Sequence, residues 1–360
     1  MSPIEGASEM QNKMLNVKLL IAGFDAMNKH FIETLIKKYE VLQKNFKIRP
    51  VIVAIIDPAL GCIYDGKGFP LHEVLCIYQG ENVLLGTRKI CTPSGALDLI
   101  RTLDYDIMVE MGAVNMETGE PSLSYIKEAI KSGHHVVTSN KGPILVAYRM
   151  LSELAEKHGV ALKFESSVMD GIPIIRLIKE GLAGDNIRRI DGIFDAGVNY
   201  VLSKMENGES FDDAVFEARQ MGFLEADPYV NLDGWDSAIK AVILANVLMN
   251  ADMRLRDVER EGISCLTRDD MRWIMRNGRR IRLITRIWRE NGKVRASVKP
   301  ELLEFSEEFA YVTGYRISVS FTLEAAGKIV VMGSGMSSMR IAQAILSDVI
   351  SICMKMRNRE

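Results

Sequence analysis

A lysine and an aspartate four residues apart are the side chains best suited to acid–base chemistry. Lys240 falls in a segment that we expect to be helical from Ser237 to Leu248, and Asp236 immediately precedes that segment. Positions i and i+4 share one face of a helix. In a dry site, desolvation lowers the pKa of a lysine, which can then accept a hydroxyl proton. On a solvated helix the same spacing is usually a surface ion pair. The spacing alone therefore does not distinguish a catalytic pair from a surface ion pair.

The turn after the first predicted strand is the place for a dinucleotide phosphate. An apolar run from Val17 to Ala22 ends at Gly23, where such a site carries the pattern G-x-G-x-x-G. Only the first glycine is present, because Asp25 and Asn28 stand at the other two positions. Two like charges about 4 Å apart repel by roughly 1 kcal/mol in water and 4 kcal/mol at intermediate dielectric, so Asp25 opposes a diphosphate.

Asp57 ends the second predicted strand. A carboxylate there suits the ribose diol and favours NAD over its 2′-phosphorylated form. It lies farther from Gly23 than the usual interval of about 20 residues. Taken alone, the motif leaves dinucleotide binding open.

Strands and helices alternate through the first part of the chain. This alternation predicts βαβ units and a parallel sheet, hence a Rossmann-like dinucleotide-binding domain over residues 15–143 that is completed by the helical segment 333–360. The predicted strands are Val17–Ala22, Pro50–Ile56, Tyr105–Glu110 and His135–Thr138, and the predicted helices are Phe31–Leu42, Ser122–Lys131 and Arg340–Met356.

Residues 144–332 have a mixed pattern that predicts an α+β domain, so the chain as a whole belongs to the α/β class. Arg280–Trp288 and Val294–Val298 flank Asn291-Gly292, a dipeptide typical of a two-residue hairpin turn. The other predicted helices are Leu145–Lys157, Ile172–Glu180 and Ser237–Leu248, and the other strand-like runs are Ala161–Phe164 and Ile190–Phe194.

The composition is that of an ordinary globular protein with two domains. The chain has 360 residues, of which 48% are hydrophobic and 26% charged, with a formal net charge of -2. This balance gives no overall field toward nucleic acid or an anionic membrane, and no apolar run approaches the roughly 20 residues of a membrane span. With scattered cysteines and no signal-peptide pattern, we expect a cytoplasmic protein without nucleic-acid or membrane partners.

Seven arginines crowd the segment from Arg272 to Arg289. Basic runs that bind single-stranded nucleic acid carry interleaved aromatic side chains, and only Trp273 and Trp288 lie here. We therefore expect a solvated face or a subunit contact.

Several blocks, in this order and spacing, resemble homoserine dehydrogenases, and the resemblance runs from about Val17 to Ile352. It implies interconversion of homoserine, or a related hydroxy amino acid, and aspartate semialdehyde with NAD or NADP, in amino-acid biosynthesis and by a homodimer. The second domain would then bind substrate, catalyse and dimerise. The blocks are Gly119–Pro121, Thr138–Pro143, Glu165–Ile174, Asn199–Leu202, Gly222–Pro228, Asp233–Lys240, Val298–Pro300 and Ala342–Asp348.

The resemblance also implies roles for individual residues. The catalytic positions are Lys141, Lys240 and Asp236. Glu225 matches the carboxylate that holds the substrate ammonium, and the other substrate-side positions are Asn231, Asp195 and Gly197. The cofactor-side positions are Gly23, Asp25, Asn28, Asp57, Gly112, Asn140, Gly335 and Met336. Backbone carbonyls hold a monovalent cation in the family, and by position they belong to Glu165, Val168, Asp170 and Ile172.

The departures from the family pattern gather around its ligands. On the cofactor side, Gly112-Ala113 replaces Thr-Pro, and Gly333–Ser337 replaces Gly-x-Gly-Ala-Gly. On the substrate side, Asp195-Ala196-Gly197 replaces Asn-Gly-Thr, and Asn231 replaces an aspartate. This clustering leaves a second hypothesis open: a diverged member with another substrate, or a lyase or isomerase, in which NAD is lost or repurposed.

Overall fold

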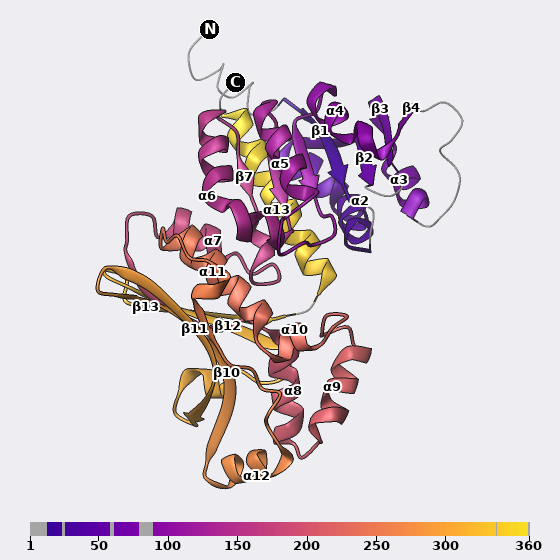
Figure 1. The fold of residues 1–360 in the computed structure, drawn as a ribbon. Helices are drawn as coiled ribbons and strands as arrows, with labels where there is room; N and C mark the ends of the chain where they lie inside the picture. The colour runs from indigo at the N-terminus through magenta and orange to yellow at the C-terminus, as the bar shows by residue number, and fades with distance from the viewer. Residues whose placement is uncertain (1–12, 24–25, 58–60, 79–88, 336, 359–360) are drawn as a thin grey trace. The chain divides into compact units, whose positions relative to one another are not determined.

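The computed structural model describes residues 13–23, 26–57, 61–78, 89–335 and 337–358. The chain divides into a first unit, Met1–Ser167 with Ser338–Glu360, and a second unit, Val168–Ser337 (Figure 1). Each unit is built on one sheet with helices, which confirms the α/β class. The domain limits expected from the sequence, 15–143 with 333–360 and 144–332, stay a prediction. No helix among the described residues is long and apolar enough to cross a membrane.

The sheet of the first unit has the strand order β4-β3-β2-β1-β5-β6-β7. β1 pairs in parallel with β2 on one side and with β5 on the other, so the winding reverses at β1. In open α/β sheets ligands bind at the carboxyl ends of the strands beside this reversal. The strands are β1 (Leu15–Ala22), β2 (Ile48–Asp57), β3 (Gly61–Phe69), β4 (Lys89–Cys91), β5 (Ile107–Glu110), β6 (His135–Thr138) and β7 (Leu162–Lys163).

The four strands predicted from the sequence pair in parallel, as expected, and β3 and β4 add an antiparallel edge that was not predicted. β3 is antiparallel to β2, and β4 is antiparallel to β3. The register jumps from Tyr64 opposite Ala54 to Phe69 opposite Ile52, so the glycine-rich residues between Tyr64 and Phe69 bulge out. This bulge interrupts the apolar alternation by which a strand is predicted from sequence.

Two helices far apart in the sequence pack together in the core of the first unit. α2 buries Phe31 and Leu35, and α13 buries Ile345 and Val349, in one cluster that includes Leu19 and its neighbours on β1, β2 and β5. The C-terminal helix α13 therefore contributes directly to the core of the first unit. The helices of this unit are α2 (Ala26–Phe46), α3 (Leu71–Tyr78), α4 (Ala96–Thr102), α5 (Ser122–Lys131), α6 (Lys141–Lys157) and α13 (Ser338–Arg357).

The sheet of the second unit has the order β13-β12-β8-β10-β11-β9. β10 and β11 form a long antiparallel hairpin. Its turn residues Asn291 and Gly292 have φ of 50° and 75°, the conformation that such a dipeptide supplies, so the predicted hairpin is confirmed. The strands are β8 (Ile187–Ile193), β9 (Val258–Arg260), β10 (Arg279–Glu290), β11 (Lys293–Glu304), β12 (Arg316–Leu323) and β13 (Lys328–Ser334).

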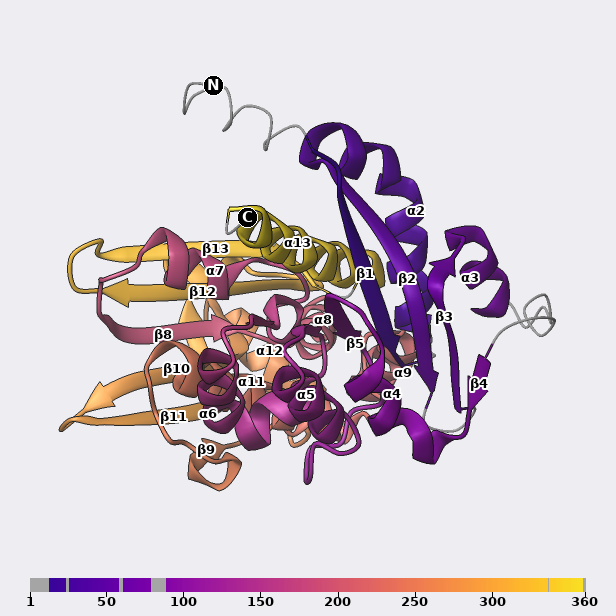
Figure 2. The same cartoon turned by 90° about the horizontal axis from the view of Figure 1, so that it is seen from above.

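Helix α11 is the interior helix of the second unit. It contacts β10 and β11, and most of its residues are buried, as expected for a largely apolar helix. Figure 2 shows the strands β8, β12 and β13 of the same sheet side by side. The helix predicted over Ile172–Glu180 is instead the short α7 followed by a π turn, Leu177–Gly181. The helices of this unit are α7 (Ile174–Arg176), α8 (Ala196–Glu206), α9 (Phe211–Gln220), α10 (Tyr229–Leu232), α11 (Trp235–Leu248) and α12 (Arg268–Arg276).

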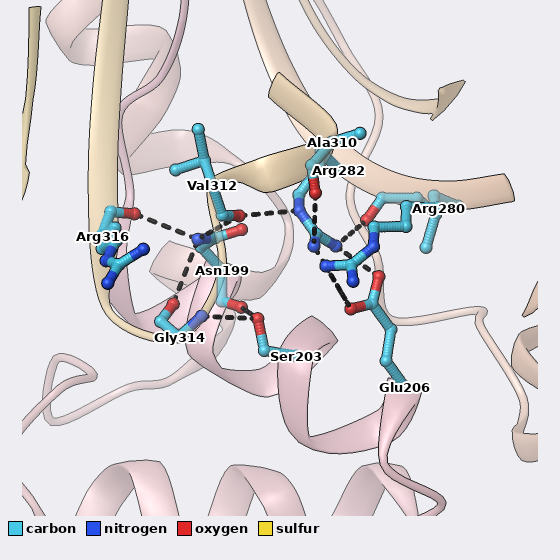
Figure 3. Close-up of polar contacts among 10 residues, drawn as sticks. Asn199, Ser203, Glu206, Arg280, Arg282, Ala310, Val312, Gly314 and Arg316 are labelled. Carbon is cyan, nitrogen blue, oxygen red and sulfur yellow. Dashed lines mark hydrogen bonds and ion pairs between the residues drawn. The ribbon is translucent and has the colours of Figure 1, made fainter. Parts of the chain in front are cut away.

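An arginine is fully buried in the second unit (Figure 3). Arg282 of β10 is 0% exposed, and its guanidinium donates to both carboxylate oxygens of Glu206, at 2.6 and 3.2 Å. Its Nε donates to the carbonyl of Val312 at 2.9 Å. The expectation that the arginine run forms a solvated face or a subunit contact is wrong at Arg282, because this side chain is buried and a long-range partner on α8 compensates its charge.

Asn199 extends the same cluster toward β12. Its amide nitrogen donates to the carbonyls of Val312, Gly314 and Arg316 at 3.0–3.1 Å (Figure 3). An amide NH₂ has two hydrogens, so one of them is shared between two acceptors. The Asn199 side chain thus fixes the path of the chain into β12.

Candidate active site

The predicted acid–base pair is an interior ion pair. Lys240 and Asp236 of α11 are 6% and 4% exposed. The ammonium of Lys240 lies 2.7 Å from Oδ2 of Asp236 and donates at 2.7 Å to the carbonyl of Phe194. Its third N–H has no partner among the described residues and is therefore available to a substrate oxygen.

Three carboxylates set the protonation state of Lys240. Burial by itself lowers the pKa of Lys240, but Asp236, Asp170 and Asp195 raise the pKa above its ordinary value. The expectation that desolvation would yield a neutral lysine is therefore wrong for this site without ligands. Lys240 is therefore held as an ammonium, the protonated form that can donate a hydrogen bond to a substrate oxygen.

Lys240 should stay charged across the whole neutral and mildly alkaline range. The raised pKa means that its stabilising charge is present below the ordinary value of about 10.4 and is lost only as the pH rises beyond it. The ε-carbon NMR signal of Lys240, assigned by its loss in Lys240→Arg, should not titrate between pH 6 and 9. A titration step within that window would contradict the charged assignment.

Asp195 faces the same pair from the start of α8. Its Oδ1 accepts from the backbone N–H of Val198 at 2.9 Å and caps the helix, and its Oδ2 accepts from Asn231 at 2.8 Å. Burial raises the pKa of Asp195, and Asp236 raises it further, whereas Lys240 and the hydrogen bonds oppose this. The carboxylates and the ammonium therefore form one electrostatic group.

Asn231 and Gly197 place the main chain of Glu225. The Asn231 oxygen accepts from the Glu225 N–H at 2.9 Å. A Cβ at Gly197 would lie 2.0 Å from the carbonyl oxygen of Phe223, so only glycine lets α8 approach this segment. The Glu225 side chain itself is exposed. The second unit thus brings the four predicted substrate-side positions together.

The predicted cofactor-side residues of the first unit lie at the ends of neighbouring parallel strands. Gly23 follows β1, Asp57 ends β2, Gly112 follows β5 and Asn140 follows β6. This is the edge, beside the reversal at β1, that suits a dinucleotide. The residues at the strand ends therefore fit the cofactor that the sequence predicts.

The turn at Gly23 requires glycine. Its φ is +117°, and a Cβ would lie 2.8 Å from both the Asn28 amide nitrogen and the Met111 carbonyl oxygen. Asn28 is buried and donates to that carbonyl at 3.2 Å, so it ties α2 to the end of β5. Asp25 and Met336, also predicted on the cofactor side, lie outside the described residues.

The remaining predicted residues lie in defined places. Lys141 is the first residue of α6, whose N-terminus is capped by Asn140. Gly335 lies in the second unit, where a Cβ would be 3.1 Å from Oδ2 of Asp170. Among the described residues no three His, Cys, Asp or Glu side chains gather as a metal site; this leaves untested a cation held by backbone carbonyls. The predicted cation positions, which follow β7, are Glu165, Val168, Asp170 and Ile172.

Sequence reasoning missed Glu110, the last residue of β5. This buried carboxylate accepts from the hydroxyls of Ser122 and Thr138, each at 2.6 Å, from the Gly112 N–H at 2.8 Å and from the Asn140 amide at 3.4 Å. Burial raises the pKa of Glu110, and these bonds oppose the rise. The signal in the sequence is an acidic residue at the end of an otherwise apolar strand.

Glu110→Ala should weaken NAD binding at least tenfold and lower the thermal unfolding midpoint. The change leaves several buried donors without an acceptor, at about 1–3 kcal/mol each, and releases Gly112 and Asn140. Calorimetric titration with NAD and a melting curve measure both effects. Glu117→Ala, in the exposed loop after β5, is the control and should change neither. Wild-type affinity in Glu110→Ala would remove Glu110 from the cofactor site.

Family models match most of the chain. A homoserine dehydrogenase model matches residues 173–350, and a model for the NAD-binding domain of homoserine dehydrogenase matches residues 76–165. The chain is 34% identical over 345 residues to an NAD(+)-dependent homoserine dehydrogenase from Pseudomonas canavaninivorans, covering 94% of this chain and 97% of that protein. It is 36% identical over 335 residues to a homoserine dehydrogenase from Methanocaldococcus jannaschii, covering 93% and 98%.

Solved structures give the same result. A putative homoserine dehydrogenase from Archaeoglobus fulgidus has a TM-score of 0.82 at 32% identity and covers 93% of this chain and 99% of its own. A mutant of a hyperthermophilic archaeal homoserine dehydrogenase in complex with NADPH has a TM-score of 0.79 at 28% identity, covering 95% and 98%. Similarity over nearly the full length of these proteins shows that the chain belongs to the homoserine dehydrogenase family.

Proposed function

We propose that the protein is a homoserine dehydrogenase that interconverts homoserine and aspartate semialdehyde with NAD or NADP. The observation that carries this proposal is the buried Asp236–Lys240 pair, whose ammonium keeps one N–H available among the described residues. Strand ends of the first unit that fit a dinucleotide support it, as do the similar proteins named homoserine dehydrogenase. Those relatives support the dehydrogenase reading and not the lyase or isomerase alternative.

The bound nicotinamide would supply the acceptor or donor of the hydride. The residues of the chain manage the proton. In the reducing direction, Nζ of Lys240 donates a proton to the aldehyde oxygen, which becomes the hydroxyl of homoserine. Asp236, whose Oδ2 lies 2.7 Å from Nζ, stabilises the ammonium and holds the Lys240 side chain in position. In the oxidising direction Nζ must first release its proton to solvent, and the neutral amine then accepts the proton of the hydroxyl.

The first unit would hold the cofactor through the residues at its strand ends. Asp57 would accept from the ribose diol, which favours NAD over NADP. Gly23 and Gly112 would let the main chain approach the dinucleotide, and Asn140 would fix the loop after β6. Asp25, Asn28, Gly335 and Met336 complete the proposed cofactor residues.

The second unit would hold the amino-acid substrate. Glu225 presents an exposed carboxylate for the ammonium group, while its main chain is fixed by Asn231. Asp195 and Gly197 would shape the same part of the site. Lys141, the first residue of α6, is proposed as a second catalytic lysine.

We further propose that the enzyme acts in amino-acid biosynthesis in the cytoplasm as a homodimer, with a monovalent cation held by backbone carbonyls. Val330 and Met332 support the dimer, because both are nearly half exposed on the edge strand β13 and edge strands are ready sites of association. Light scattering after size-exclusion chromatography measures the oligomeric state. A monomeric mass at micromolar concentration would contradict the proposed homodimer.

The decisive experiment is a calorimetric titration of the purified protein with NAD and NADP, followed by an assay of homoserine oxidation by nicotinamide absorbance. We expect micromolar binding of NAD, weaker binding of NADP, and turnover of homoserine. Absence of binding in a preparation free of co-purified nucleotide would mean that the altered turn has abolished the cofactor site. Binding of NAD without turnover of homoserine would contradict the proposal that homoserine is the substrate.

A further inference from the structure

Four residues of the second unit are linked by a chain of three hydrogen bonds. The Val198 N–H donates to Asp195, the Asn231 amide nitrogen donates to the other oxygen of Asp195, and the Glu225 N–H donates to the Asn231 oxygen, all at 2.8–2.9 Å. Asp195 and Asn231 are both buried. The chain thus links the start of α8 to the residue that would hold the substrate ammonium.

The direction of these bonds is dictated by the two ends. A backbone N–H can only donate, so Asn231 must present its oxygen to Glu225. Its nitrogen must then face residue 195, where an acceptor is required. At the other end, the Val198 N–H also requires an acceptor. An aspartate at 195 and an asparagine at 231 satisfy every donor, and a flipped Asn231 amide would break two bonds at once.

We propose that Asp195 and Asn231 work as one exchangeable positioning pair that sets where Glu225 meets the substrate ammonium. The pair acts through Glu225 rather than by contact with the reacting atoms. The inference rests on the proposed function for its substrate, and on the three hydrogen bonds for its mechanism.

The contact between the two side chains is complementary. Asn231 supplies the donor and Asp195 the acceptor at their 2.8 Å contact. Exchanging the carboxylate and the amide between the two positions keeps the same number of donors, acceptors and charges in the pair.

Gly197 lies against the same segment. A Cβ at this position would lie 2.0 Å from the carbonyl oxygen of Phe223. Phe223 is two residues before Glu225, so this contact fixes the same stretch of chain from its other side. Asp195, Asn231 and Gly197 therefore support the same segment of main chain.

Hydrogen-bond polarity gives a sharp expectation for single changes. Asn231→Asp sets two carboxylates against each other at the 2.8 Å contact. Asp195→Asn sets an amide nitrogen against the Asn231 nitrogen once its oxygen caps Val198. Each change leaves a buried polar group unpaired or repelled, which corresponds to roughly a tenfold to hundredfold effect. The exchange Asp195→Asn with Asn231→Asp restores all three bonds with every donor satisfied.

The test is a double-mutant cycle on the full-length protein. We expect each single variant to raise KM for homoserine at least tenfold, with the KM for NAD within about threefold of wild type. The change in kcat should be smaller than the change in KM, although it need not be zero, because Asp195 also raises the pKa of Lys240. The exchanged double variant should recover KM to within about threefold. Asp252→Asn, a change of the same chemistry at an exposed position, should have no effect.

Two outcomes would contradict the proposal that Asp195 and Asn231 together position Glu225. A double variant no better than the worse single variant shows that the side chains act independently. Single variants with unchanged KM show that they do not place Glu225. Melting curves of wild type, the two single variants and the double variant test the coupling of Asp195 and Asn231 independently of the proposed function. If wild type fails to oxidise homoserine, the function fails, whereas loss of thermal stability in the single variants and its recovery in the double variant still decide the coupling.

Discussion

Replacing Lys240 by alanine should lower kcat by about 10²–10⁴-fold while leaving NAD affinity within about threefold of wild type. The change removes the Lys240 ammonium that we propose donates to the substrate oxygen, and it removes the positive charge that lies 2.7 Å from the buried carboxylate of Asp236. Steady-state kinetics in both directions, with calorimetric titration of NAD, measure the two quantities separately.

The lysine substitution needs a control for loss of any lysine. Lys293 is exposed at the β10–β11 turn, so Lys293→Ala should keep full turnover. Lys240→Arg preserves the charge but not the geometry and should stay at least tenfold below wild type. Full activity in Lys240→Ala would remove Lys240 from the mechanism and transfer the proton to Lys141.

Arg282→Ala should lower the free energy of unfolding of the second unit by about 3–5 kcal/mol, the usual effect of breaking a buried ion pair. The variant would leave Glu206 buried beside Arg280 alone and would deprive the Val312 carbonyl of a donor. Tryptophan fluorescence during urea unfolding reports this unit, because Trp235, Trp273 and Trp288 all belong to it.

Removing both charges distinguishes a buried ion pair from simple packing. Arg282→Met combined with Glu206→Leu should cost less than Arg282→Ala, because no unpaired charge remains in the interior. Lys299→Ala breaks an exposed ion pair with Glu259 and should change stability by less than about 1 kcal/mol. A loss in Arg282→Ala as small as in Lys299→Ala would contradict the importance of the buried pair.

The fold was most predictable where local pattern and local structure coincide. The expected helix Ser122–Lys131 and strand His135–Thr138 match α5 and β6 in both bounds. Asn291 and Gly292 predicted the hairpin because left-handed backbone at both positions is a local preference. The strand β3 was missed because its bulge breaks the period of two, and periodicity was the only signal available.

The site shows the same division. The Asp236–Lys240 spacing predicted that the two side chains would meet, but not that α11 is an interior helix or that three carboxylates would keep Lys240 charged. Asp195 and Asn231 are 36 residues apart, so their bond could not be read from either segment. Arg282 and Glu206 are 76 residues apart, and a run of arginines gives no sign of which member is buried.

The return of α13 to the first unit has a consequence for how the protein is made. The second unit is one continuous stretch, whereas the first unit needs both its opening residues and Ser338–Arg357. Synthesis proceeds from the N-terminus and domains generally fold as they emerge. The apolar residues of α2 and β1 that pack against Ile345 and Val349 therefore stay without these contacts until the whole second unit has been synthesised. The part of the protein that handles the nucleotide is thus the first to be synthesised and the last to be finished.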